Sequence, residues 1–249
     1  MSPDLQQQLS AFCQAVREDL LLLALLHDRE LDRELIQGLW RECQEDFFGF
    51  QLKSESSRQA LQRFHQGLQD IPKELDPSTL DILAAEFADI YLNYSFHIAP
   101  CESVWTDEDG LTHQESMFQV RHWYEHYGVR VADWRKRPDD HLVTQLQFIA
   151  HLLESEPSPQ QFKAIAHFLD EHLLRWIEAF SSRLSERCRT RFYGGLALLT
   201  SAYLIELRDL LAERFDLPRP TQEAIDQRIR GKEKTEEAAP FLPGIAPSW

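Results

Sequence analysis

The stretch RPDDHLVTQLQFIAHLL, Arg137 to Leu153, indicates the structural class of the whole chain. Its apolar residues Leu142, Leu146, Ile149 and Leu153 recur at intervals of three and four, which places them on one face of an α-helix. Almost every other periodic segment has the same spacing, and none alternates apolar and polar residues as a half-buried strand would. The pattern predicts an all-α protein, a single-domain helical bundle.

The helical period continues on both sides of this stretch. Helices are expected at about residues 4–26, 29–43, 56–68, 77–94 and 114–127 before it, and at 159–184 and 191–215 after it. The helix at Pro77 has the clearest start, because Asp76 can cap free backbone N–H groups and proline suits the first helical position. Gly128 is expected to close the 114–127 helix. Gly194 and Gly195 are expected to permit close contact between helices or to mark a helix start.

The 159–184 segment contains FLDEHLLRWIEAF, which we interpret as core. Phe168, His172, Trp176 and Phe180 fall at four-residue spacing and should line one side of a continuous helix.

The chain changes character after Phe215. Residues 1–215 are expected to form the helical domain, and residues 216–249, which are charged and rich in proline, a mobile tail with a short helix near 222–230. Truncation after about Asp216 should therefore leave the fold intact.

Composition limits the classes of function. The chain has 249 residues, 43% of them hydrophobic and 27% charged, as is usual for a soluble globular protein. Its 26 basic against 41 acidic residues give a net charge of −15, which argues against nucleic acid and anionic membrane surfaces and favours a basic partner. The sequence has neither the features of a secretory signal nor an apolar run of the roughly 20 residues that membrane insertion needs. A cytoplasmic location is expected.

Few motifs suggest catalysis or a cofactor. The four cysteines are scattered without a C-x-x-C pair, and no glycine-rich phosphate loop occurs, so no cofactor is expected. The string HWYEH, His122 to His126, places two histidines on one side of a helix with Glu125 between them, which leaves a zinc-dependent hydrolase as an alternative. Such a site still needs a third ligand and an open position. A second alternative is an acidic adaptor for some other basic protein.

The start of the 142–153 helix allows two interpretations. Asp139 as N-cap with Asp140 in the first turn would satisfy backbone N–H groups and complement the helix dipole, so capping alone accounts for both acids. The charge of His141 is not predicted, because the helix dipole favours the neutral imidazole and the neighbouring Asp140 favours the charged one. The three residues are either a helix cap or part of a site.

An ordered set of motifs favours the site. From about Leu83 to Leu211 the chain contains, in order, Tyr91 with the nearby aromatics Tyr94 and Phe96, then Pro100-Cys101-Glu102-Ser103-Val104-Trp105, Asp140-His141, and His172-Leu173 with Trp176 and Phe180. This set resembles the signature of the TorD/DmsD family of redox-enzyme maturation chaperones. The chain departs from it at Cys101, where many members have tyrosine, at Gln114, where glycine is common, and at Gln145, where many have glutamate.

The resemblance implies a cytoplasmic chaperone rather than an enzyme. Members bind the twin-arginine leader and/or the apo catalytic subunit of a molybdenum-cofactor oxidoreductase, assist cofactor insertion and delay export until the enzyme has folded. Expected partners are that leader, that subunit and molybdenum-cofactor delivery proteins, for a chaperone that is a monomer or a homodimer.

The resemblance also implies a peptide site. Its expected residues are Tyr94, Pro100, Glu102, Ser103, Trp105, Asp140, His141 and Gln145. A leader presents two guanidinium groups beside an apolar segment, so its receptor needs carboxylates next to an apolar groove. Asp140 and His141 are therefore expected to be both cap and site, with one carboxylate serving the helix and the other facing a groove formed with the 94–105 loop.

Overall fold

A computed structural model describes residues 3–43, 47–94 and 98–237, with side chains as far as Ile229. Within these ranges every regular element is helical, and one isolated β-bridge joins Cys101 to His141. The predicted all-α class is confirmed. Across the same ranges, no helix has the length and apolar character needed to cross a membrane.

The helices and helical turns of the described ranges follow in chain order. They are α1 (Pro3–Asp28), α2 (Arg33–Glu42), α3 (Glu55–Gln69), α4 (Pro77–Phe87), the π-helical turn η1 (Ala88–Leu92), α5 (Ser103–Thr106), α6 (Glu115–His126), α7 (Leu142–Leu152), α8 (Pro159–Glu171), the 3₁₀ turn η2 (Leu173–Arg175), α9 (Ile177–Arg187), α10 (Arg191–Phe215) and α11 (Gln222–Glu237).

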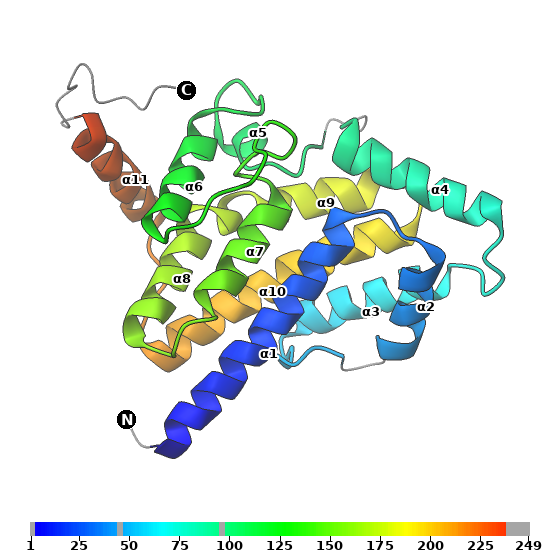
Figure 1. The fold of residues 1–249 in the computed structure, drawn as a ribbon, viewed down its shortest axis with the longest axis horizontal. Helices are drawn as coiled ribbons and strands as arrows, with labels where there is room; N and C mark the ends of the chain where they lie inside the picture. Colours follow the sequence, from blue (N-terminus) through cyan, green and yellow to red (C-terminus); the bar gives the residue numbers. More distant parts are fainter. Residues whose placement is uncertain (1–2, 44–46, 95–97, 238–249) are drawn as a thin grey trace.

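The long helix α10 organises the bundle. It runs through the middle of the molecule and packs against α3, α8 and α9, while α1 packs against α7 (Figure 1). Glycines allow the closest approach: a Cβ on Gly195 would lie 2.9 Å from the Cα of Phe64 on α3, nearer than side-chain carbons come to backbone. The predicted close contact at this position is confirmed.

The start of α4 and the end of α6 form where the sequence predicts them. The Asp76 carboxylate accepts a hydrogen bond from the backbone N–H of Thr79 at 2.7 Å, and Pro77 is the first residue of α4. Gly128 follows α6 with a φ of +71°, a left-handed conformation that favours glycine. Beyond α4 the helix widens into η1, which places Tyr91 in the core.

The prediction of one continuous helix over 159–184 is wrong. The helix α8 ends at Glu171, His172 adopts φ −126° and ψ −89°, and α9 begins only at Ile177 after the turn η2. The buried His172 imidazole lies 3.0 Å from the Glu102 carboxylate, a tertiary contact that the local period does not encode. Phe168, His172, Trp176 and Phe180 are all buried as expected, but they lie on two helices and the turn between them.

The C-terminal segment begins with contacts to the bundle. Arg208 on α10 donates to the carbonyl oxygens of Leu217 at 2.7 Å and Pro218 at 3.2 Å, and Ile225 on α11 is buried. The predicted short helix is present and continues to Glu237. The domain boundary at residue 216 and the mobility of the tail stay predictions, and Pro240, Pro243 and Pro247 lie outside the described residues.

Candidate functional site

The structure brings the two predicted site segments together at the start of α7. The backbone N–H of Leu142 donates to the Pro100 carbonyl at 2.8 Å, and that of Glu102 donates to the Asp140 carbonyl at 3.1 Å. The Cys101–His141 bridge lies between these bonds. The loop at 98–106 is thus fixed to the first residues of α7.

The predicted Asp139 cap is wrong, whereas the expectation that His141 caps α7 is confirmed. Its Nδ1 accepts a hydrogen bond from the backbone N–H of Val143 at 3.1 Å. Burial lowers the pKa of His141 to about 3, with a further contribution from the charges of Arg137 and His27, so the imidazole is neutral and can accept this bond. Neither neighbouring acid serves the helix end. Asp139 instead pairs with Arg121, and Asp140 turns toward Ser103.

Asp140 is fully buried and incompletely satisfied. Its Oδ2 accepts hydrogen bonds from the Ser103 backbone N–H at 2.8 Å and from the Ser103 hydroxyl at 2.6 Å. Its Oδ1 is buried without a hydrogen-bond partner among the described residues. Burial raises the pKa of Asp140 to about 6, although the two bonds from Ser103 oppose the rise.

A second buried carboxylate lies beside the first. Glu102 Oε2 accepts a hydrogen bond from Gln145 Nε2 at 2.8 Å, and Glu102 Oε1 lies 3.0 Å from His172 Nδ1. Arg175 Nη1 lies 3.9 Å from the same Oε1. We call Glu102, Ser103, Asp140, Gln145 and His172 the carboxylate cluster. It ties the loop to α7 and to the break between α8 and α9.

Two predicted residues reach the surface beside this cluster. Trp105 is half-buried: its indole N–H donates to the Ala99 carbonyl at 2.9 Å, and the Arg183 guanidinium lies 5.0 Å from its ring centre. Tyr94 is half-buried with a φ of +50°, and its pKa is raised, chiefly by burial and also by Cys101. The other six predicted residues, Pro100, Glu102, Ser103, Asp140, His141 and Gln145, are buried. Phe96 lies outside the described residues.

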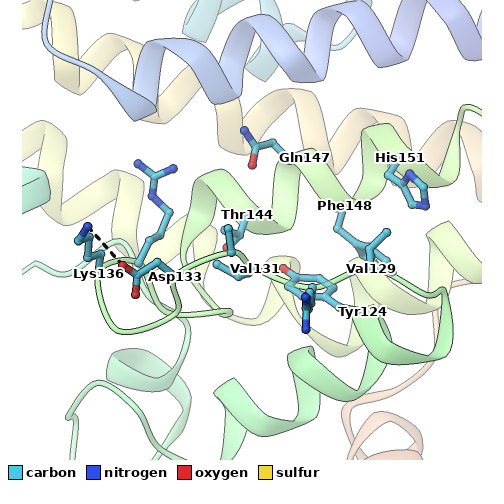
Figure 2. A pocket seen from close by; sticks show the side chains of 12 residues that line it. Tyr124, Val129, Val131, Asp133, Lys136, Thr144, Gln147, Phe148 and His151 are labelled. Atoms are coloured by element: carbon cyan, nitrogen blue, oxygen red, sulfur yellow. Dashed lines mark ion pairs between the residues drawn. The ribbon is translucent and has the colours of Figure 1, made fainter.

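A pocket of about 550 Å³ lies between the 129–137 loop and α7. Figure 2 shows its apolar wall, with Tyr124 and Phe148, and the ion pair between Lys136 and Asp133. Arg130 and Arg137 also line it. The excess of cations makes this pocket unsuitable for a leader arginine. Sequence reasoning missed it, although the run RKRP at 135–138 signalled a local basic segment in an acidic chain.

The zinc alternative gains no support. His122, Glu125 and His126 are exposed on α6. In the part of the chain that the structure describes, no group of three His, Cys, Asp or Glu side chains could hold a metal ion.

Comparison with known proteins relates the chain to chaperones. Residues 51–182 match the family described as nitrate reductase delta subunit. The chain is 35% identical over 141 residues to the chaperone protein TorD of Vibrio cholerae serotype O1, which covers 53% of this chain and 64% of that protein. It is 27% identical over 215 residues to TorD of Vibrio vulnificus, covering 83% and 99% respectively. It is 30% identical over 101 residues to a probable Tat proofreading chaperone, DmsD, of Haemophilus influenzae, covering 41% and 47%. The chain thus spans less than two thirds of the V. cholerae protein.

Proposed function

The chain belongs to the TorD/DmsD family of redox-enzyme maturation chaperones, and on that ground we propose that it binds the twin-arginine leader and/or the apo catalytic subunit of a molybdenum-cofactor oxidoreductase. It holds this client in the cytoplasm, assists cofactor insertion, delays export until the client has folded, and catalyses no reaction of its own.

The carboxylate cluster is the observation that carries the proposal. A carboxylate buried without full pairing costs stability, and a fold can replace such groups with apolar residues at little loss. Here Glu102 and Asp140 are both fully buried, and Asp140 Oδ1 and Gln145 Oε1 accept no hydrogen bond from the described residues. Acceptors held in this way suit a ligand that brings its own N–H donors, as a guanidinium does.

The predicted site residues divide into two roles in this proposal. Tyr94 and Trp105 contact the apolar segment of the leader, because they alone among the eight reach the surface. The six buried residues hold the 98–106 loop against α7. Asp140 and Glu102 accept from a leader arginine only when that loop moves away from α7, because both carboxylates are fully buried.

Net charge adds a long-range contribution. A formal charge of −15 attracts a cationic leader and raises the association rate, and dissolved salt screens the attraction. Association should therefore slow as ionic strength rises, whereas the dissociation rate should change little.

The test is titration of fluorescently labelled leader peptides, taken from molybdoenzymes of the same genome, into the purified protein. A leader with two arginines should bind more tightly than its twin-lysine counterpart, since lysine lacks the planar donor fork. Trp105→Ala should weaken binding by about 2 kcal/mol, the scale of an aromatic anchor at an interface. The control Leu5→Ala, which changes an exposed residue at the start of α1, should leave affinity unchanged. Failure of every twin-arginine leader to bind would refute the leader as a ligand and leave only the apo catalytic subunit.

A further inference from the structure

We propose that Asp139, Phe118 and Trp134 form a guanidinium-binding site that the chain's own Arg121 fills, and that an arginine of the leader competes with Arg121 for it. The inference rests on the proposed function for the identity of the competing ligand, but the site itself follows from the geometry. We call these three residues the Asp139 site.

The Asp139 site encloses the Arg121 guanidinium on three sides. Arg121 Nη2 lies 2.7 Å and Nε 3.1 Å from Asp139 Oδ2. The guanidinium carbon lies 5.3 Å from the ring centre of Phe118 and 4.9 Å from that of Trp134. Phe118 and Arg121 share a face of α6 at i, i+3 spacing, whereas Trp134 comes from the 127–141 loop.

Each part of the site favours a guanidinium over other cations. The Asp139 side chain is only 4% exposed, so its charge requires a hydrogen-bonded partner. Aromatic faces attract cations, and a planar guanidinium can stack on such faces while it donates to a carboxylate. An ammonium group could not satisfy both arrangements in the same position.

The site is also open enough for exchange. Phe118 is 49% and Trp134 38% exposed, and the Arg121 side chain is 27% exposed. Arg121 can therefore swing into solvent while an incoming guanidinium takes its place. The carboxylate then remains paired throughout, because one guanidinium replaces another.

An internal competitor gives selectivity. A free arginine only exchanges with Arg121 and gains little, whereas a leader also places an apolar segment on the exposed rings of Phe118 and Trp134. Because Arg121 occupies the site for part of the time, the apparent affinity of every guanidinium ligand is its intrinsic affinity multiplied by the fraction of time that the site is free. Removal of Arg121 should therefore raise affinity, the opposite of the loss expected from an ordinary binding residue.

The first experiment uses Arg121→Gln, which keeps a polar side chain and removes the guanidinium. The variant should have a lower melting temperature than the wild type, because Asp139 loses its partner. Agmatine at millimolar concentration should restore part of the loss, and equal ionic strength of sodium chloride or of the ammonium analogue cadaverine should not. The double variant Arg121→Gln/Asp139→Asn should not respond to agmatine. Equal responses to agmatine and cadaverine would overturn the site.

The second experiment measures leader affinity. Arg121→Gln should bind the leader about tenfold more tightly than the wild type, because the competitor is gone. The matched control is Arg135→Gln, since the Arg135 guanidinium lies 5.3 Å from the Trp134 ring centre but is not bonded to Asp139. It should bind as the wild type does. An unchanged or lower leader affinity of Arg121→Gln, with folding intact, would overturn the competition.

The two experiments separate this inference from the proposed function. Agmatine rescue together with no leader binding by any variant would support the Asp139 site and refute the leader as its ligand. Leader binding by the wild type without agmatine rescue would refute the site and keep the proposed function. If Arg121→Gln does not fold, Trp134→Ala replaces it: this variant keeps the ion pair, and it should bind the leader about tenfold more weakly, as loss of a cation–π contact implies. An unchanged affinity of Trp134→Ala would then overturn the inference.

Discussion

Two buried aspartates are treated in opposite ways by this fold. Asp170 on α8 has both oxygens bound by the Arg208 guanidinium, at 2.8 and 2.9 Å, and Arg208 donates its other bonds to backbone carbonyls. Asp140 has one oxygen bound by Ser103 and the other bound by no described residue. We call the ion pair of Asp170 and Arg208 the closed pair, because both carboxylate oxygens already accept hydrogen bonds. Asp140 Oδ1, in contrast, can still accept one. The difference shows that the two carboxylates differ in free acceptor capacity, and it agrees with our proposal that Asp140 binds a ligand, whereas Asp170 serves stability.

The largest effect should come from breaking the closed pair. Arg208→Met leaves the Asp170 carboxylate buried without its partner and should lower the free energy of unfolding by about 3–5 kcal/mol. Urea denaturation at neutral pH measures this loss. The double variant Arg208→Met/Asp170→Leu should recover much of it, because no buried charge remains. A single variant as stable as the wild type would remove the basis of the comparison.

The next effect concerns pH and Asp140. Because the folded pKa, about 6, lies above the usual value of 3.8, the folded state binds a proton more tightly than the unfolded state does. Wild-type stability relative to Asp140→Asn should therefore fall as pH rises from about 4 to about 6, by on the order of 2–3 kcal/mol, and then stay constant.

Urea denaturation of both proteins at pH 4.5, 5.5 and 7.5 tests this prediction. Subtracting one curve from the other cancels the opposite effect of His27 and His141. Burial lowers the pKa of each to about 3, so their contribution to stability grows as pH rises from about 3 to 6.5. Parallel curves of stability against pH for the wild type and Asp140→Asn would show that burial does not raise the pKa of Asp140.

A smaller effect should come from removing the two C-terminal carbonyls that accept hydrogen bonds from Arg208. A chain that ends at residue 216 lacks the Leu217 and Pro218 carbonyls and should lose about 1–3 kcal/mol, the penalty for buried donors without acceptors. A chain that ends at residue 229 keeps them and should be as stable as the full chain. Thermal unfolding of both truncations, with circular dichroism, makes the comparison. Equal stability of the shorter chain would support the domain boundary at residue 216.

The smallest effect sets the baseline for exposed pairs. Arg17 on α1 lies 2.7 Å from Glu154, and the two side chains are 36% and 48% exposed. Arg17→Gln should lower the free energy of unfolding by less than about 1 kcal/mol. The difference should disappear at high salt, which screens exposed charges. A loss as large as that of Arg208→Met would mean that burial does not determine how much each ion pair contributes to stability.

Local signals predicted most of the helices. The apolar period located their bodies, and Asp76, Pro77 and Gly128 act at the helix ends as their chemistry requires. The failures occur where a distant partner overrides a local preference. His172 leaves the helical conformation beside Glu102, 70 positions earlier in the chain, and the Asp139 carboxylate turns from the helix end to Arg121. Such contacts depend on which helix faces meet, which a single sequence does not state.

The sequence predicted that residues of the candidate site lie together, but it did not predict that most of them are buried, and their role in peptide binding stays a prediction. The ordered motifs brought Glu102, Ser103, Asp140 and Gln145 into one set, and these residues contact one another. Burial could not be foreseen, because polar residues of this kind usually remain in water. The Asp139 site was not predicted, for a similar reason. Phe118, Arg121 and Trp134 form no sequence motif on α6 and the loop after it, and only the fold brings them to Asp139.

The packing of α3 on α10 has a consequence for folding during synthesis on the ribosome. Ala60, Phe64 and Leu68 on α3 are buried in the finished bundle, but α10, the main partner of α3, lies far along the chain. Roughly 120 residues separate the end of α3 from the start of α10, so at about 5–20 residues per second translation needs about 6–25 s to supply the partner. During that interval the apolar face of α3 has no partner from α10 and can associate with other exposed apolar surfaces. We expect general holdases to bind the nascent chain during this interval.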